Sequence, residues 1–143
     1  MAKLSQIKNV VAVKDAAGNL DITSKTRVLA PELDVYSGDD SLTLPMLAVG
    51  GKGVISVASH VAGLEIKEMI ESFEAGDTKK AMELHLKLFP LFKVLFVVSN
   101  PIPVKEALNM MGINVGGLRP PLIPADENVK EAIKKVLKDL GKI

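Results

Sequence analysis

Residues 10–60 alternate short apolar runs with patterns typical of helices. Residues 10–13, Val-Val-Ala-Val, lack the alternation of apolar and polar positions expected of a strand with one solvated face. They predict a strand that is buried on both sides. The turn-rich segment 14–19 follows, and Asp21 is then placed to cap a short helix that runs towards Pro31.

The same strand-and-helix pattern occurs again along the chain. Residues 34–37 predict a second strand, residues 42–49 an apolar helix with a proline early in it, and residues 54–57 a third strand. Strands separated by helices at this spacing are typical of βαβ units, in which the strands run parallel. The carboxyl ends of such strands are where α/β proteins build their sites. An α/β fold with a site at that edge of the sheet is therefore expected.

No further strand is predicted beyond His60. Apolar side chains recur at helical spacing, and glycine, aspartate and proline residues separate one run from the next. The predicted helices span residues 64–74, 77–98, 104–111 and 126–140. The sequence thus divides into an α/β part, residues 1–63, and a helical part, residues 64–143.

Composition narrows the classes of function. The formal net charge of +1, with no tryptophan, does not provide the basic and aromatic surface typical of nucleic-acid binding. The absence of cysteine excludes disulfides and thiolate metal sites, and two distant histidines do not suggest a zinc site. The longest apolar stretch, residues 84–98, is interrupted by charges and is shorter than a membrane helix of about 20 residues. We expect no metal, no nucleic acid and no membrane partner.

Lys14 has the clearest chemical potential, because it ends an apolar strand. A lysine amine attacks a carbonyl only when it is neutral, and at the ordinary pKa of about 10.4 only about one in a few thousand is neutral at pH 7. An apolar surround that desolvates an amine lowers that pKa and activates it. The residues alone leave two interpretations of Lys14 open: an activated nucleophile, or a lysine whose ammonium group simply reaches water.

Other polar residues have a structural interpretation beside a functional one. Asp39 and Asp40 follow a glycine at the start of a predicted helix, where capping explains adjacent carboxylates. The Gly-Gly-Lys-Gly run at residues 50–53 precedes a strand and lacks the ending of a phosphate-binding loop. His60 is either a general base after a strand or a hydrogen-bonded structural histidine, and His85 lies inside a predicted helix.

Five segments of the chain carry a family pattern. They are residues 11–19 (VAVKDAAGN), 36–40 (YSGDD), 50–57 (GGKGVISV), 99–108 (SNPIPVKEAL) and 119–122 (RPPL). The first three resemble the sixth, seventh and eighth strands of the dihydrodipicolinate synthase family. The last two resemble its C-terminal helical region and favour it over the related N-acetylneuraminate lyases. The resemblance covers essentially the whole chain, with His60 and Pro120 as local departures.

The resemblance implies an α/β fold made of the C-terminal three βα units of a (β/α)8 TIM barrel, residues 1–63, followed by an α-helical region, residues 64–143. It implies a cytoplasmic lyase of lysine biosynthesis that condenses pyruvate with aspartate semialdehyde, without a metal or organic cofactor. Lys14 falls on the family's Schiff-base lysine. Gly38 and Ile55 fall where backbone groups line the pyruvate pocket.

The family's first five strands have no counterpart in this sequence. By the resemblance, those strands carry the tyrosines and threonine of the proton relay and the arginine that holds the substrate carboxylate, and Tyr36 does not match a relay position. A nucleophile without acid–base partners loses the factor of about 10²–10⁴ that positioned proton transfer supplies. We therefore expect the isolated chain to be inactive or very weak.

Three interpretations of such a half-barrel are open. It is a fragment of a full-length enzyme, a separately encoded half that pairs with an N-terminal half, or a degenerate, non-catalytic protein. Three parallel strands cannot close a barrel, which needs about eight, and their outer edges are free to pair. The expected macromolecular partner is accordingly a second copy, in a homo-oligomer, or an N-terminal half-barrel.

Overall fold

Three short strands form a parallel sheet in the order β1-β2-β3, which confirms the parallel pairing predicted for them. In the computed structural model, which describes residues 1–143, β1 spans Ala12–Asp15, β2 spans Asp34–Ser37 and β3 spans Gly53–Val54. The register places Lys14 beside Tyr36, and Tyr36 beside Gly53. The third strand is shorter than predicted, although the N–H of Ile55 still donates to the Ser37 carbonyl at 2.8 Å.

The chain divides into two units. Unit 1 consists of Met1–Ser56 and Met69–Met82, and unit 2 consists of Val57–Glu68 and Glu83–Ile143. The sheet belongs entirely to unit 1. The division between an α/β part, residues 1–63, and a helical part, residues 64–143, stays a prediction.

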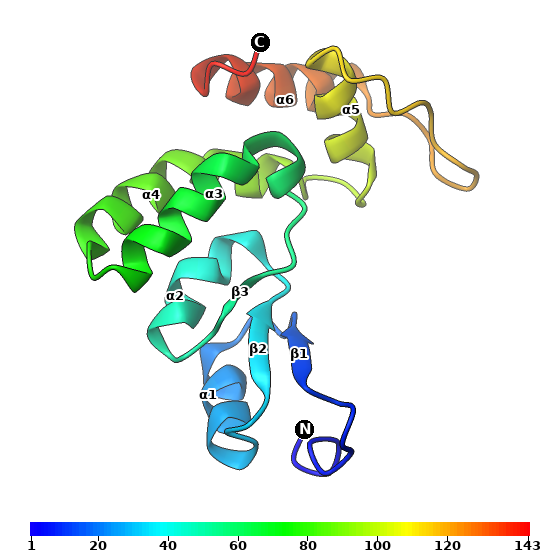
Figure 1. The fold of residues 1–143 in the computed structure, drawn as a ribbon. Helices are drawn as coiled ribbons and strands as arrows, with labels where there is room; N and C mark the ends of the chain where they lie inside the picture. The colour runs from blue at the N-terminus through cyan, green and yellow to red at the C-terminus, as the bar shows by residue number, and fades with distance from the viewer. The chain divides into compact units, whose positions relative to one another are not determined.

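The helices of unit 1 lie between the strands in sequence. They are α1 (Leu20–Leu29), the 3-10 turn η1 (Asp40–Leu42) and α2 (Thr43–Ala48). The residue that caps α1 is Asn19 and not Asp21 as predicted, because the side chain of Asn19 accepts a hydrogen bond from the Asp21 N–H at 2.9 Å. Helix α2 packs on β2, β3 and α1 (Figure 1).

The sheet has one covered face and one open face. The side chain of Asp15 accepts a hydrogen bond from Thr23 of α1, so Asp15 lies on the face that the helices cover. Because side chains alternate along a strand, this assigns every other strand residue to one of the two faces. The helix-covered face carries Val13, Asp15, Val35 and Ser37, and the opposite face carries Ala12, Lys14, Asp34 and Tyr36. The prediction that the first strand is buried on both sides is wrong for this structure: Val11 is 68% exposed. The reason is that β1 is an edge strand, paired only with β2.

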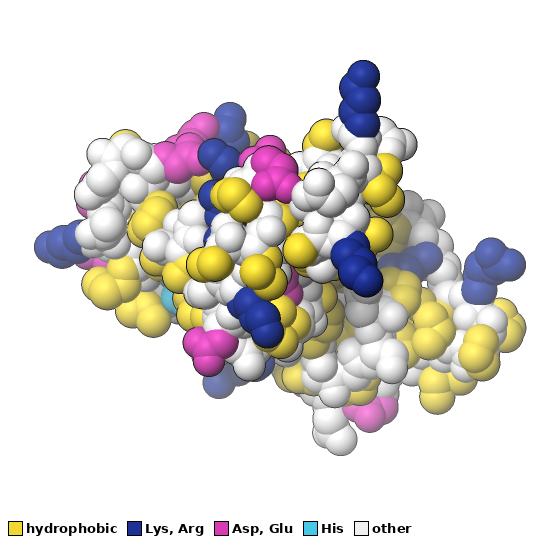
Figure 2. Space-filling view, turned by 90° about the horizontal axis from the view of Figure 1, so that it is seen from below, with side chains coloured by type: hydrophobic (Ala, Val, Ile, Leu, Met, Phe, Trp, Pro, Cys, Tyr) yellow, Lys and Arg dark blue, Asp and Glu magenta, His cyan; other side chains and the backbone are white.

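The core of unit 1 lies beneath the covered face of the sheet. Leu33, Val35, Met46 and Leu47 are buried there. Other large apolar side chains reach the surface, and Figure 2 shows hydrophobic side chains interspersed with charged ones on the face that it draws. Hydrophobic burial on one side of the sheet therefore holds unit 1 together while the Lys14 side stays open.

The remaining helices follow the predicted order with shifted ends. They are α3 (Ser59–Glu74), α4 (Thr78–Val94), α5 (Ile102–Met110) and α6 (Glu127–Asp139). Asp77, an aspartate between two of the predicted helices, accepts a hydrogen bond from the Lys80 N–H at 3.0 Å and so caps α4. None of these helices combines the length and the apolar character that a membrane crossing requires.

In unit 2, α5 and α6 pack against each other. Ile133 and Leu137, four residues apart on α6, are fully buried, and Asp126 caps this helix by accepting from the Val129 N–H at 2.9 Å. The side chain of Asn109 braces the segment that follows α5, because it accepts from the Val115 N–H at 3.1 Å.

Candidate active site

Lys14 and Gly38, both predicted to be site residues, lie against each other. A Cβ atom placed on Gly38 would be 2.9 Å from Lys14 Cε and 2.7 Å from Ala16 Cβ. Ordinary contacts between carbon atoms are about 3.5–4.0 Å, so position 38 has no room for a side chain. The N–H of Gly38 also donates to the Asp15 carbonyl at 2.7 Å. The loop after β2 is thus packed closely on the stem of Lys14.

The surroundings of Lys14 differ from the sequence expectation. The apolar run before it predicts a desolvated stem, whereas the residue is exposed. Its strand lies at the edge of the sheet, and neither α1 nor α2 covers the face to which it belongs. In this chain the lysine is held at its stem by Gly38 and is open to water elsewhere.

Asp15 ties the end of β1 to the start of α1. One carboxylate oxygen accepts from the Ala17 N–H at 3.0 Å, and the other accepts from the Thr23 hydroxyl at 2.7 Å. Thr23 is only 1% exposed. This pair was not predicted from the sequence. The feature that could have indicated it is a threonine hydroxyl in the first turn of the helix that follows a strand ending in Lys-Asp.

Ile55, the third predicted site residue, lies one residue beyond β3. Its backbone N–H donates to the carbonyl of Ser37, which ends β2 and precedes Gly38. The segments that follow β2 and β3 therefore start side by side at the carboxyl edge of the sheet. The next residue, Ser56, donates its hydroxyl to the carboxylate of Asp40, which is only 2% exposed. This bond, also missed from sequence, fixes the chain just after Ile55.

The two aspartates after Gly38 have different roles. Asp39 accepts from the Ser41 N–H at 3.0 Å and from its hydroxyl at 2.9 Å, which confirms the capping interpretation. Asp40 lies at the start of η1 but is buried against Ser56, so capping does not describe it fully. Both interactions order the loop that carries Gly38.

Both histidines belong to unit 2, whereas Lys14, Gly38 and Ile55 belong to unit 1. The side chain of His60 is exposed, and its backbone N–H donates to the Val57 carbonyl at 3.2 Å within a turn. In unit 2, His85 has a buried Nδ1 without a hydrogen-bond partner, and desolvation by burial lowers its pKa below the usual value of 6.5. Its ring lies 6.1 Å from the Phe89 ring centre and 6.0 Å from that of Phe92. Contact with two aromatic rings of its own helix favours a structural role for this half-buried histidine.

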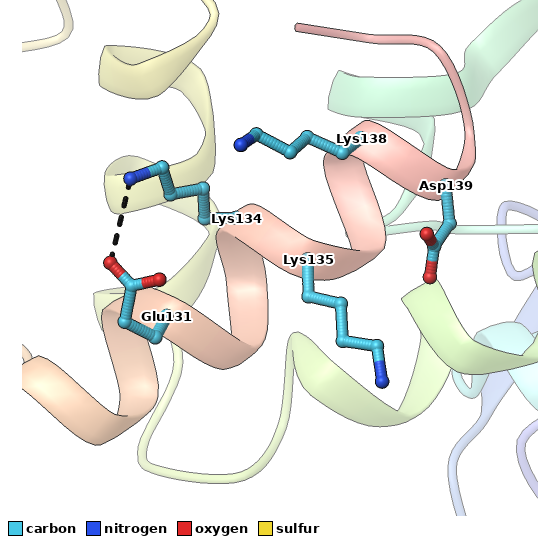
Figure 3. Close-up of a pocket in the computed structure, with 5 residues that line it drawn as sticks. All are labelled: Glu131, Lys134, Lys135, Lys138 and Asp139. Carbon is cyan, nitrogen blue, oxygen red and sulfur yellow. Dashed lines mark hydrogen bonds and ion pairs between the residues drawn. The ribbon is translucent and has the colours of Figure 1, made fainter.

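A shallow hollow on α6 is a second place where charges gather (Figure 3). Its volume is about 270 Å³, and it is lined by Glu131, Lys134, Lys135, Lys138 and Asp139. Lys134 pairs with Glu131 at 3.5 Å, and Lys135 extends away from Lys134 and Lys138. These charges do not converge on one point. No group of three or more acidic or histidine side chains is arranged to hold a metal ion.

The chain matches the model of the dihydrodipicolinate synthetase family over residues 1–140. It is 50% identical to 4-hydroxy-tetrahydrodipicolinate synthase of Nostoc punctiforme over 144 aligned residues, which cover 100% of this chain and 49% of that protein. The crystal structure of dihydrodipicolinate synthase from Thermotoga maritima is 42% identical, with a TM-score of 0.95, over 99% of this chain and 50% of that one.

A pyruvate-bound structure is similar as well. The chloride-inhibited dihydrodipicolinate synthase of Acinetobacter baumannii, complexed with pyruvate, is 37% identical with a TM-score of 0.93, over 99% of this chain and 49% of that chain. The chain therefore spans about half the length of the relatives that it matches.

Proposed function

The chain belongs to the dihydrodipicolinate synthetase family, and we propose that its Lys14 is the nucleophile that forms an imine with pyruvate. The parent reaction is the condensation of pyruvate with aspartate semialdehyde to 4-hydroxy-tetrahydrodipicolinate, a lyase step of lysine biosynthesis. The pyruvate complex of the 37% identical Acinetobacter baumannii enzyme supports this choice of substrate.

The chemistry assigned to Lys14 needs no metal or organic cofactor. The neutral amine adds its electron pair to the keto carbon of pyruvate, and the carbinolamine then loses water to form an iminium. The iminium draws electrons from the adjacent methyl group, which loses a proton to give an enamine. The enamine carbon attacks the aldehyde carbon of the second substrate, and the aldehyde oxygen takes up a proton to become the hydroxyl of the product. The amino group of the second substrate then adds to the imine carbon, which closes the ring, and the lysine amine leaves.

One observation carries the assignment: Gly38 is packed on the stem of Lys14 so closely that a Cβ would lie 2.9 Å from Lys14 Cε. We assign Gly38 and Ile55 to the wall of the pyruvate pocket, through their backbone groups. The bond between the Ile55 N–H and the Ser37 carbonyl supports this, because it brings the exit of β3 to the residue before Gly38.

At the level of the fold, we assign β1, β2 and β3 to the sixth, seventh and eighth strands of a (β/α)8 barrel. The open face that carries Lys14 then corresponds to the barrel interior. In a full barrel, the remaining strands cover this face and exclude water from the amine, which is the condition that favours attack on a carbonyl. Residues 64–143 correspond to the C-terminal helical region.

Borohydride trapping tests the nucleophile directly. The chain is incubated with pyruvate and sodium borohydride and weighed by mass spectrometry, and the expected product carries one carboxyethyl group on Lys14. Lys14→Arg keeps the positive charge but cannot form the imine, so it should stay unmodified. Peptide mapping should find Lys52, an exposed lysine of the same unit, unlabelled. A folded chain that gains no mass, or gains it equally at Lys52, refutes the assignment.

The exposed edge strand favours a second candidate function, that of a half-barrel acting through association. Val11 is 68% exposed beside β1, whose outer edge pairs with no strand. Such an edge is a template for another strand. The partner is a second copy of the chain or an N-terminal half-barrel, and in this reading the isolated chain performs no condensation.

Complementation separates the two candidates. The N-terminal half of the Nostoc punctiforme synthase is produced alone and mixed with this chain, and condensation of pyruvate with aspartate semialdehyde is measured for each half and for the mixture. We expect negligible activity from this chain alone and a rise on mixing that Lys14→Arg abolishes. A stable complex without activity supports the non-catalytic half-barrel. Activity of the chain alone contradicts the expected need for a second half.

A further inference from the structure

We propose that Thr23 is a positioning residue for Lys14, acting through the carboxylate of Asp15. The inference rests on the proposed function of Lys14 and extends it to a side chain on the opposite face of the sheet. Thr23 lies in the first turn of α1, eight residues after Asp15, and its hydroxyl donates to Asp15 Oδ2 at 2.7 Å. The competing acceptor, the Asn19 carbonyl one helical turn back, is 3.5 Å away, so the carboxylate is the better partner.

Asp15 connects this helix to the loop that touches the lysine. Its side chain holds Thr23 and the Ala17 N–H, and its backbone carbonyl accepts from the Gly38 N–H at 2.7 Å. One residue therefore links α1, the turn after β1 and the turn after β2. Because Asp15 directly follows Lys14 in the strand, a shift of Asp15 moves the Cα of the lysine as well.

The space around Gly38 makes the lysine sensitive to such a shift. The Ala16 Cβ and Lys14 Cε both lie within 3 Å of the point where a Gly38 Cβ would be. Glycine leaves that point empty, so the backbone of this loop lies beside the stem of Lys14, and a shift of the loop changes where the stem can lie. Thr23, which is only 1% exposed, holds Asp15, and Asp15 holds the loop of Gly38 that lies beside the lysine stem. Through these contacts Thr23 influences the direction of the Lys14 amine.

The bond is of the kind that fixes geometry. It joins the half-buried carboxylate of Asp15 to the hydroxyl of a buried threonine, and hydrogen bonds to a carboxylate are shorter and stronger than those between neutral groups. Replacing Thr23 by valine keeps the volume and β-branching but leaves Asp15 Oδ2 without this donor. Replacing it by serine keeps the donor and loses only a methyl group.

The test compares three variants of the full chain. Thr23→Val removes the hydroxyl, Thr23→Ser retains it, and Thr26→Val makes the same substitution at another buried threonine of α1, which is only 8% exposed and does not bond to Asp15. The readouts are the rate of borohydride trapping as a function of pyruvate concentration and the hydrogen exchange of the Gly38 amide. Circular dichroism checks that each variant is folded.

We expect Thr23→Val to lower the maximal trapping rate, by up to about 100-fold for a displacement near 1 Å, and to speed exchange at Gly38. Thr23→Ser should restore both readouts, and Thr26→Val should leave both unchanged. Equal trapping by Thr23→Val and the wild-type chain overturns the inference and leaves Lys14 as the nucleophile. If the wild-type chain does not trap pyruvate, the proposed function fails, and unchanged Gly38 exchange in Thr23→Val then overturns the positioning role independently.

Discussion

Replacing Gly38 by alanine tests whether the close packing on Lys14 is required. The new Cβ would lie 2.7 Å from Ala16 Cβ and 2.9 Å from Lys14 Cε, against an ordinary carbon contact of about 3.5–4.0 Å. The lysine stem can turn aside, but Ala16 Cβ is fixed by the backbone. Relief therefore requires that the two loops separate by close to 1 Å, against the 2.7 Å hydrogen bond from the Gly38 N–H to Asp15.

The expected cost follows from that overlap. Insertion of one carbon into a packed site typically lowers the free energy of unfolding by about 1–3 kcal/mol, and we expect the Gly38→Ala chain to fall in this range. The trapping of pyruvate on Lys14 should fall more steeply than stability, because the stem has been pushed from its place. Urea denaturation measures the first effect, and the rate of borohydride trapping measures the second.

Gly117→Ala is the matched control. A Cβ at Gly117 meets no atom within 4 Å, so the same substitution adds a methyl group without a clash. This variant should trap pyruvate at the wild-type rate and unfold within about 0.5 kcal/mol of it. A Gly38→Ala chain that behaves like Gly117→Ala would refute the claim that glycine is required beside the lysine.

Three other substitutions or conditions have directions set by the structure. Thr43 Oγ1 is buried without a hydrogen-bond partner, so Thr43→Val should raise the free energy of unfolding by about 1 kcal/mol, measured by urea denaturation, and a loss would show that the hydroxyl is bonded. Burial lowers the pKa of His85, because the folded chain disfavours the protonated ring. Its contribution to stability is therefore complete above about pH 6.5 and falls as the pH drops below that value. His85→Phe should flatten this pH dependence, measured by urea denaturation between about pH 7.5 and about pH 5. Partial burial of Glu65 raises its pKa, but the hydrogen bond and charge of Lys142 and the charge of Lys87 outweigh this, so the pKa is lowered on balance. Lys142→Met should therefore reduce the free energy of unfolding by at most about 1 kcal/mol near neutral pH, and by less in acid that protonates Glu65. Equal losses in urea denaturation at neutral and at acidic pH would contradict the pairing.

The sequence pattern predicted the order of elements better than their ends. Periodicity placed the third helical segment of the chain at residue 64, whereas α3 begins at Ser59. Gly63 and the β-branched Val61 weaken the helical signal there, and Ala62 has non-helical backbone angles inside the helix. The third strand is short because Ser56 leaves the ladder and bonds to Asp40. Such tertiary bonds are not visible in a local window of residues.

The candidate site shows the same limit. A family pattern selected Lys14, Gly38 and Ile55 from the sequence, and the contact between the first two is present in the structure. Their role in chemistry stays a proposal. The exposure of Lys14 could not be read from its apolar neighbours, because burial of a strand depends on which strands flank it. The bond from Thr23 to Asp15 depends on where α1 lies relative to β1, which periodicity does not encode.

The crowding at Gly38 has a consequence for sorting related sequences. Two groups exclude a side chain there, and one of them, Ala16 Cβ, has no part in the chemistry. A descendant that lost its lysine would still be selected for glycine at this position, since the turn after β2 has to fit over the turn after β1. We therefore expect glycine at this position to indicate the shape of the two turns, and not by itself the presence of the reaction. A lysine at the position of Lys14 is then the first condition for the reaction, and the proton-transfer groups that the resemblance places on the family's first five strands are the second.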